Sequence, residues 1–360
     1  MKRIIAQDAD IAMGIDAGKS HLTITVVANG EVVKQATIAY SRVAIESFLS
    51  RFSGCRIRAA YEAGCFGYWL ADTLRELGVM VTVTPPSKLE RAPGDKVKTE
   101  RRDSRRLGEQ LAAGRLKAVA IPTEAERATR QLVRTYGQLK RTRGQAMCRI
   151  TSFLEFHHVL VPREVGRRWT KRFLHWLETL SFADRPEGKY LRLSLDQLLL
   201  AYRNLTVQVN ELKKEVGRMA ETPRYKRAAT VLAANDGIGE LSAMIILTET
   251  QNVGRFRISQ RFTSNLGLTP SEHSTGDQQH RGHITKAGNR HIRGILIQCA
   301  WAWIRKDAAA RARYRRLSRL RGPKRAIVAM ARRLAVKIYW QLRAIHFGQR
   351  SLASETQRAA

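Results

Sequence analysis

The chain has 360 residues, with 64 Lys and Arg against 31 Asp and Glu, and its formal net charge of +33 gives a pI near 11. Self-repulsion of this size disfavours a compact state unless a polyanion neutralises it, so nucleic acid is expected as the partner and a membrane is not. Four scattered cysteines without a CxxC pair, no uncharged stretch of membrane-spanning length and no signal peptide predict a cytoplasmic, nucleoid-associated protein without structural zinc.

The N-terminal part of the chain has the pattern of an α/β domain. Residues 11–38 contain three runs of alternating residues typical of strands, and Asn29 and Gly30 form the turn signal of a hairpin between the last two. The elements expected next are a helix at 41–52, a strand at 55–62, a helix at 67–77, a strand at 79–84 and a helix from Thr99. Three antiparallel strands followed by helix–strand units is the order of an RNase H-like (RuvC-like) domain, which we predict for residues 1–123.

Residues 124–222 are predicted to form an α-helical coiled-coil arm. Apolar residues recur there at seven-residue steps and then at alternating steps of four and three: Leu132, Leu139, Ala146, Phe153 and Leu160, followed by Leu191, Leu195, Leu198, Tyr202, Leu205, Val209, Leu212, Val216 and Met219. Two long helices with such a seam form a coiled coil. The pattern leaves open whether the seam pairs within one chain or between two chains, and a homodimer through the arm is preferred.

Residues 223–360 are predicted to form a mainly α-helical domain. In "NDGIGE", Gly237 and Gly239 lie between two helical segments, which is the pattern of a helix-hairpin-helix whose turn offers backbone N–H groups to a phosphate. Two amphipathic helices follow further along, and residues 311–325 between them are dense in basic side chains and contain no acid. The nucleic-acid contacts expected there are Arg315, Arg316, Lys324 and Arg325.

Four acids are candidate ligands of a divalent metal. Asp16 is predicted at the end of the first strand and Glu62 at the end of the fourth. Glu100 and Asp103 lie three residues apart, on one face of a helix. Because the first and fourth strands are neighbours in an RNase H-like sheet, the carboxylates could meet at one point, where they would repel one another. Two Mg²⁺ ions (or Mn²⁺) would remove this repulsion and clamp the attacking and leaving oxygens of a phosphodiester. The basic residues expected to hold the nucleic-acid backbone beside them are Arg101, Arg102 and Arg105.

Each acid also has an ordinary structural interpretation. Asp16 could be a turn residue and Glu62 a solvated strand end, while Glu100 and Asp103 could form helix salt bridges with neighbouring arginines. A different class, the sugar-kinase and actin-like ATPases, opens with a phosphate loop similar to "GIDAG". These ATPases need a second glycine-rich loop on a β-hairpin, whereas "NDGIGE" lies between helical segments. The metal site therefore depends on the four acids occurring together in this order of elements.

A polar, glycine-rich segment, "PSEHSTGDQQHRGHITKAGNRH", contains candidate nucleophiles. Ser271, Ser274 and Thr275 are followed by glycines and by the cations Lys286 and Arg290. A hydroxyl beside such cations could attack a phosphodiester as a covalent nucleophile, with the cations stabilising the developing charge. The alternative from the residues alone is a loop that only contacts phosphate.

Three blocks of the sequence, together with its tail, share a pattern with one known family. The blocks are "GIDAGKSHLTI", "YEAGCFGYWLADTL" with "VKTERRDSRRLGEQL", and "GIGELSAMIILTE" with "RFTSNLGLTPSEHSTGDQQHRGHITKAGNRHIRGIL"; the tail is "AIVAMARRLAVKIYWQLR". In order and spacing they resemble the bridge-RNA-guided DEDD transposases of the insertion sequence one-hundred-and-ten family, eleven-eleven subgroup. The resemblance implies a RuvC-like domain, a coiled-coil segment and a C-terminal transposase domain with a nucleophilic serine.

The resemblance also implies roles for particular residues. The metal ligands would be Asp16, Glu62, Glu100 and Asp103. Glu100 stands where the family usually has Asp and reaches one carbon further. The family's serine usually stands directly before a glycine, where this chain has Thr275, and Ser274 lies one residue earlier. Ser274 is the preferred nucleophile because a β-branched threonine is stiffer and more hindered.

The function that these features predict is RNA-guided DNA recombination. Such a transposase excises and inserts an insertion-sequence element through a covalent hydroxyl–DNA phosphate intermediate, assisted by Mg²⁺. Its partners would be donor and target DNA, a structured guide RNA encoded by the element, and further copies of the chain, as dimers that pair into a tetramer. One alternative is a RuvC-like junction-resolving or RNase H-like nuclease that uses water, and another is a non-enzymatic architectural protein whose acids only form salt bridges.

Overall fold

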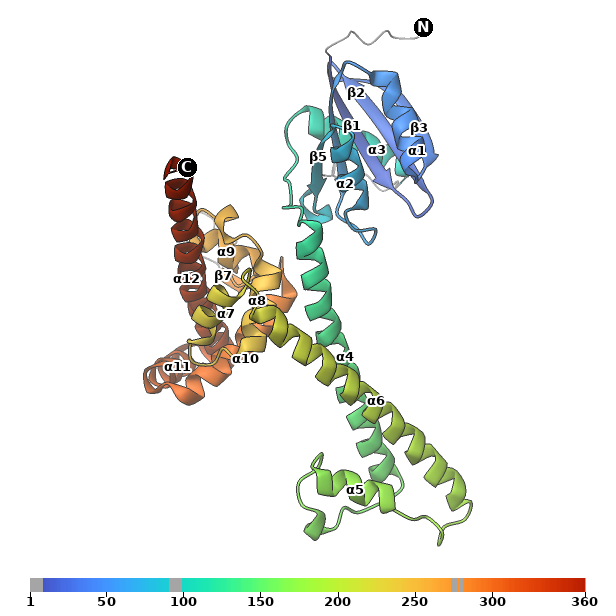
Figure 1. The fold of residues 1–360 in the computed structure, drawn as a ribbon, viewed down its shortest axis with the longest axis vertical. Coiled ribbons are helices and arrows are strands. Elements are labelled where there is room, and N and C mark those ends of the chain that lie inside the picture. The colour runs from blue at the N-terminus through green and yellow to red at the C-terminus, as the bar shows by residue number, and fades with distance from the viewer. Residues whose placement is uncertain (1–8, 91–98, 273–277, 279–280, 360) are drawn as a thin grey trace. The chain divides into compact units, whose positions relative to one another are not determined.

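A computed structural model describes residues 9–90, 99–272, 278 and 281–359, with the side chains of residues 281 and 348–359 excepted (Figure 1). The chain divides into two compact units, Met1–Pro122 and Thr123–Ala360, and each is described by itself. Residues 124–222 thus share one unit with the C-terminal residues, and the finer division into 1–123, 124–222 and 223–360 stays a prediction.

The first unit is built on a mixed five-stranded sheet (Figure 1). Its strands are β1 (Asp10–Ala17), β2 (His21–Ala28), β3 (Glu31–Ala39), β4 (Arg56–Glu62) and β5 (Met80–Thr84). Their order across the sheet is β3-β2-β1-β4-β5, with β2 antiparallel to β1 and β3, and with β4 parallel to both β1 and β5. This arrangement is consistent with an RNase H-like fold, and it confirms that the first and fourth strands are neighbours. Asn29 and Gly30 both have positive φ (53° and 78°), as a two-residue hairpin turn requires.

The two faces of this sheet carry different helices because side chains alternate along each strand. The helices are α1 (Arg42–Leu49), α2 (Trp69–Glu76) and α3 (Glu100–Ala112). Against α1 and α2 lies the larger core, which includes Met13, Ile15, Phe48, Tyr61 and Leu70. Against α3 lies a smaller cluster of Ala12, Val27, Ala60 and Leu111. The α3 face therefore carries the even-numbered residues of β1 and β4.

Helix α3 crosses β1 at Gly14, where the two backbones nearly touch. A Cβ added at Gly14 would lie 2.0 Å from the carbonyl oxygen of Ser104 and 2.2 Å from the nitrogen of Gly108. The hydroxyls of Thr25 on β2 and Ser104 on α3 are 2.8 Å apart and fasten the same turn of the helix to the sheet. These contacts fix how close the first turn of α3 lies to β1.

Gly14→Ala is expected to lower the free energy of unfolding of the first unit by about 3 kcal/mol, because the new methyl group meets backbone atoms that cannot move aside. The matched control is Gly64→Ala, where the nearest atom is 3.9 Å from the new Cβ, and it should change the free energy by less than about 0.5 kcal/mol. Denaturant unfolding followed by circular dichroism measures both variants. Equal stability of the two would contradict the close approach of α3.

In the second unit, two long helices pack antiparallel. They are α4 (Glu124–Phe156) and α6 (Gly188–Ala220), and the short α5 (Lys171–Thr179) packs near one end of the pair (Figure 1). Val133 shares a core with Val216, while Ile150 shares another with Leu195. The seven-residue steps Leu195, Tyr202, Val209 and Val216 are all buried. The predicted seam of α6 therefore pairs with α4 of the same chain.

The predicted seam of the first long helix is correct only in part. Ala146 is buried, but Leu160 lies beyond the end of α4 at Phe156 and is 75% exposed. Helix α4 instead buries Val133 and Ile150 against its neighbours. The prediction extended the helix too far because Leu160, beyond the end of α4 at Phe156, continues the seven-residue spacing.

The rest of the second unit consists of short and long helices and a two-stranded sheet. In chain order they are α7 (Lys226–Ala233), α8 (Glu240–Thr250), α9 (Ser259–Asn265), β6 (Pro270–Glu272), β7 (Arg281–Ile284), α10 (Arg290–Lys306), α11 (Ala308–Arg321) and α12 (Pro323–Ala359). Short 3₁₀ turns occur at Ser50–Phe52, Pro86–Lys88, Arg163–Val165 and Val253–Arg255. Helix α8 is buried along most of its length and packs against α4, α6, α7 and α10, which makes it the centre of this core. Within the described residues, no helix is both long and apolar enough to cross a membrane.

Candidate functional site

Asp16 and Glu62 lie side by side in the register of the sheet. The pairing of β1 with β4 runs as far as Ile15 opposite Tyr61, so Asp16 and Glu62 are the next residue on each strand. Because side chains alternate, both acids belong to the face of Gly14, which α3 covers. On its other side Asp16 is the partner of Thr23 on β2.

Glu100 opens α3 and is tied to the strand beside Asp16. Its Oε2 accepts a hydrogen bond from Thr23 Oγ1 at 3.1 Å and lies 3.0 Å from His21 Nε2. These hydrogen bonds with His21 and Thr23 lower the pKa of Glu100 below its usual value, so the carboxylate stays charged at neutral pH. The Glu100 side chain remains 55% exposed, which leaves it accessible to a ligand.

Asp103 is the buried member of the set. It lies in the first turn of α3, is 5% exposed, and its Oδ1 is 3.2 Å from Arg106 Nη1. The salt-bridge interpretation therefore holds for Asp103 in this structure. A negative side chain in the first turn also interacts favourably with the helix dipole. Asp103 is thus held in place by its own helix, one residue before the Ser104 contact with β2.

The donor chemistry of these acids fits a hard cation. Within the described residues, no three His, Cys, Asp or Glu side chains come together as a metal cluster. Mg²⁺ in enzymes that act on phosphates is commonly held by one or two carboxylates, with the substrate phosphate and water completing its coordination. Asp16 and Glu62, adjacent on one face, match that requirement.

The arginines around the acids differ in their surroundings. Arg101 and Arg102 are exposed on the first turn of α3. Arg105 is exposed too, but its Nε is 2.7 Å from Glu109 Oε1 one turn further along the helix. A phosphate would compete with Glu109 for Arg105.

Of the candidate nucleophiles, Ser271 lies on β6, which pairs with β7. Ser274 and Thr275 themselves fall outside the described residues. Ser271, the other hydroxyl, donates a hydrogen bond to the carbonyl oxygen of His283 at 3.1 Å, so it joins the two strands. Pro270 is paired with Ile284 across the hairpin.

The end of this glycine-rich segment is anchored to α9 and α10. Gly288 has a φ of 89°, and a Cβ there would lie 1.9 Å from the carbonyl oxygen of Asn265. Asn289 donates its backbone N–H to the same oxygen at 2.9 Å and caps α10 through its side chain, which accepts from His291 and Ile292. The segment is therefore fixed at its junction with α10.

Glu249, near the end of α8, links this junction to α4, and sequence reasoning missed it. Its carboxylate accepts hydrogen bonds from Arg134 at 2.6 and 2.9 Å and from Asn289 Nδ2 at 2.7 Å, and Arg130 lies 3.7 Å away. Burial would raise the pKa of Glu249, but the bonds from Arg134 and Asn289 and the charges of Arg134 and Arg130 outweigh burial and lower it. An acid in the apolar run "ELSAMIILTE" was the available signal, because a buried carboxylate needs a partner.

Glu249→Gln is expected to destabilise the second unit by about 3 kcal/mol, the lower end for breaking a buried ion pair, because Arg134 can still reach water. Glu240→Gln, at the exposed start of the same helix, is the control and should cost less than about 1 kcal/mol. Because the folded pKa of Glu249 is lowered, its contribution is complete above the ordinary value of 4.5 and is lost as the pH falls through the folded value. Unfolding free energies at several pH values test this: the gap between wild type and Glu249→Gln should shrink in acid, and a constant gap would contradict it.

The glycine turn between α7 and α8 has a packing role. Gly237 has a φ of 85°, and a Cβ there would lie 2.4 Å from the carbonyl oxygen of Cys299 and 2.5 Å from the nitrogen of Trp303 on α10. Gly239 caps α8, and a Cβ added there would have no atom of the described residues within 4 Å, so the space beside it is open. Phosphate contact, which stays a prediction for both, is therefore sterically easier at Gly239.

The other residues predicted to contact nucleic acid have exposed side chains. They are Lys286, Arg290, Arg315, Arg316, Lys324 and Arg325. Lys286 has a φ of 53°, which is uncommon for a residue with a side chain. Arg315 and Arg316 lie on α11, and Lys324 and Arg325 lie on the first turn of α12.

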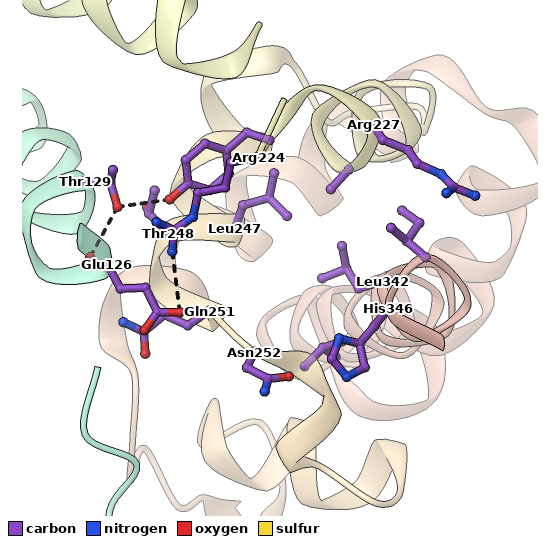
Figure 2. A pocket seen from close by; sticks show the side chains of 14 residues that line it. Glu126, Thr129, Arg224, Arg227, Leu247, Thr248, Gln251, Asn252, Leu342 and His346 are labelled. Carbon is purple, nitrogen blue, oxygen red and sulfur yellow. Dashed lines mark hydrogen bonds and ion pairs between the residues drawn. The ribbon is translucent and has the colours of Figure 1, made fainter. Parts of the chain in front are cut away.

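A small pocket lies where α4 meets the C-terminal helices (Figure 2). Its volume is about 220 Å³, and its lining includes residues of α4, α7, α8 and α12. Tyr225 donates a hydrogen bond to Thr129 at 3.0 Å, and Arg224 lies 3.6 Å from Glu126. These contacts join α4 to the residues just before α7, which is a structural role.

The chain resembles known transposases in both of its halves. Residues 13–159 match the family model DEDD_Tnp_IS110, described as a transposase, and residues 229–315 match the model described as "Transposase IS116/IS110/IS902 family". The first match contains all four candidate metal ligands, and the second contains Ser274 and Thr275.

Similar proteins cover most of the chain. Transposase y4qE of Sinorhizobium fredii is 34% identical over 84% of this chain and 74% of its own length. The transposase for insertion sequence element IS1533 of Leptospira borgpetersenii is 26% identical (81% and 84%), and that for IS1111A of Coxiella burnetii is 23% identical (84% and 82%). The chain therefore belongs to the IS110 family of transposases, enzymes that cleave and rejoin DNA.

Proposed function

We propose that this transposase excises and inserts its element by RNA-guided recombination through a covalent hydroxyl–DNA phosphate intermediate. The observation that carries the proposal is the placement of Asp16 and Glu62 next to each other on the face that the first turn of α3 covers. That turn brings Glu100 and Asp103 to the same face of the sheet. Acids on adjacent strands and on a helix of the same face support this proposal, because metal-assisted phosphodiester cleavage uses carboxylates as ligands.

The metal ligands in this proposal are Asp16 and Glu62, with Glu100 and Asp103 completing the set. Mg²⁺ (or Mn²⁺), when bound there, would supply Lewis-acid stabilisation of charge on the phosphate oxygens. The bonds with His21 and Thr23 lower the pKa of Glu100, which is charged at neutral pH and needs no proton loss to act as a ligand. Asp103 would have to share its carboxylate with Arg106 or release it.

The nucleophile in this proposal is Ser274, with Thr275 as the alternative. Its hydroxyl oxygen forms a bond to phosphorus, the bond from phosphorus to the departing strand breaks, and the departing oxygen takes up a proton. The protein–DNA ester keeps the phosphate activated, so a second DNA hydroxyl can displace the serine and rejoin the strands. Lys286 and Arg290, on the same segment, would stabilise the negative charge on the phosphate.

The partners in this proposal are donor and target DNA, a structured guide RNA and further copies of the chain. Because α6 pairs with α4 of the same chain, a coiled-coil dimer needs another apolar stripe. Helix α6 has one: Leu193, Leu200 and Val207 follow seven-residue steps and are 57%, 49% and 56% exposed. This stripe supports a homodimer through the arm, from which a tetramer on DNA would be built.

A single incubation tests the function against its alternatives. The full-length protein with its co-purified RNA is mixed with Mg²⁺ and labelled DNA, and the products are separated under denaturing conditions. A denaturant-resistant protein–DNA adduct is expected. Free cut DNA without an adduct would instead identify a nuclease that uses water, and neither product would leave a binding protein whose acids form salt bridges.

A further inference from the structure

The second unit contains a larger cavity, and Lys286 is the one described residue of its lining that the proposed chemistry uses. It has a volume of about 1020 Å³ and is lined by residues of the β6–β7 hairpin, the segment after it, and helices α11 and α12. Ligand pockets in proteins span about 300–1,000 Å³, so this cavity is large enough for a nucleotide.

One wall of the cavity is apolar. Leu268 and Ala326 are each 1% exposed, and Ile284, Leu317 and Val328 are half-buried beside them. None of these side chains carries a polar atom. Such a wall suits the flat face of a nucleobase and offers nothing to a sugar or a free phosphate.

The rim of the cavity is cationic. The lining includes Lys286, Arg321, Lys324, Arg325 and Arg332, and it includes no Asp or Glu. In the part of the chain that the structure describes, no ion pair joins any of these five to an acid. Five like charges around one opening repel one another, and a polyanion relieves that repulsion. An apolar wall within a cationic rim is complementary to a nucleotide with its flanking phosphates.

The cavity is also close to the candidate nucleophile along the chain. Pro270 lines it, and Ser274 follows four residues later. Four residues of extended chain span at most about 14 Å. A strand whose phosphate reaches the hydroxyl can therefore place a neighbouring nucleotide in the cavity.

We propose that this cavity binds an unpaired nucleotide of the DNA strand that is being cut. The base lies against the apolar wall and its phosphates lie on the cationic rim. A base inside a paired duplex is stacked on both sides and does not fit; an unpaired base does not need to be extracted first. The inference rests on the proposed recombination function and names the DNA feature that the hairpin region recognises.

Binding to two DNA duplexes tests the inference. They have the same sequence except for one additional, unpaired nucleotide, and their Kd values are measured by fluorescence anisotropy with the full-length protein. A preference of about tenfold for the bulged duplex is expected from burial of one base. Equal affinity for both duplexes would overturn the inference.

A matched pair of variants locates the effect. Ala329→Trp fills the cavity from its wall, and the ratio of the two Kd values should fall to near one. Ala312→Trp adds the same group on the exposed face of α11, outside the cavity lining, and should keep the tenfold ratio. A ratio that survives Ala329→Trp would place the nucleotide elsewhere.

Photocrosslinking of the unaltered protein tests the site without relying on a variant that could misfold. With 4-thiothymine as the unpaired nucleotide, adducts are expected on the lining residues of β7, α11 and α12, and adducts confined to other segments would contradict the site. The same bulge in an RNA duplex is the second arm, and a preference seen with RNA alone would overturn the assignment to DNA. None of these measurements needs strand cleavage. A failure of the nucleotide site can therefore be told apart from a failure of the adduct test of the proposed function.

Discussion

Asp16→Asn is expected to slow DNA strand cleavage by about a thousandfold or more while DNA affinity changes little. Asp16 lies beside Glu62 in the register of β1 and β4, on the face where α3 begins its crossing. Asparagine keeps the shape of the side chain but removes the charge that a divalent cation needs. Metal-ion catalysis is worth several kcal/mol, and each tenfold in rate corresponds to about 1.4 kcal/mol. The basic surface that binds DNA phosphates keeps its charge in this variant.

The control for this prediction lies on the same strand. Asp10→Asn makes the same substitution at the other end of β1, where the exposed Asp10 is 3.2 Å from Arg56. An exposed salt bridge contributes little, so cleavage should stay within about twofold of the unaltered rate. Single-turnover cleavage of labelled DNA with Mg²⁺ and a parallel binding isotherm measure both variants. A similar loss of cleavage in both would assign the effect to the stability of β1 and count against the metal site.

The double variant Ser274→Ala, Thr275→Ala is expected to abolish the covalent protein–DNA adduct. Both residues lie between β6 and β7, and one of their hydroxyls is the proposed attacking group. Of the single variants, Ser274→Ala should lose the adduct and Thr275→Ala should retain it, because threonine is more hindered at its oxygen. Denaturing gels of reactions with labelled DNA measure the adduct directly.

Ser271→Ala separates chemistry from the support of the hairpin. Its hydroxyl bonds to the carbonyl oxygen of His283, and losing such a bond costs about 1 kcal/mol. The adduct should still form, with a yield that recovers at lower temperature. An adduct that persists in the double variant would refute both assignments and would require another nucleophile.

Much of the first unit could be predicted from the sequence. The strands and helices before residue 113 fall within a few residues of their predicted places, and β1 and β4 are neighbours as expected. Alternation of apolar and polar residues is a local property, so each strand can be recognised in the sequence without knowledge of the strands that pair with it. The positions of Asp16 and Glu62 at adjacent strand ends followed from the same reasoning.

The features that sequence reasoning missed are long-range contacts. Glu249 meets Arg134, 115 residues away, and nothing in the spacing around either residue indicates the other. A side chain at Gly14 has no space only because α3 passes directly over it. The heptad pattern of α6 was compatible with pairing to α4 or to a second chain. Such a pattern predicts an apolar stripe on a helix but not which helix packs against it.

The sequence by itself determined the order of elements, the strand ends that carry acids and the cationic character of the chain, since each depends on residue type and on local spacing. Only the tertiary structure decided that α6 pairs within the chain, that Asp103 is held by Arg106, and that a cationic rim and an apolar wall enclose one cavity beside the β6–β7 hairpin. These depend on which distant segments meet, and that is settled by the packing of whole elements against one another.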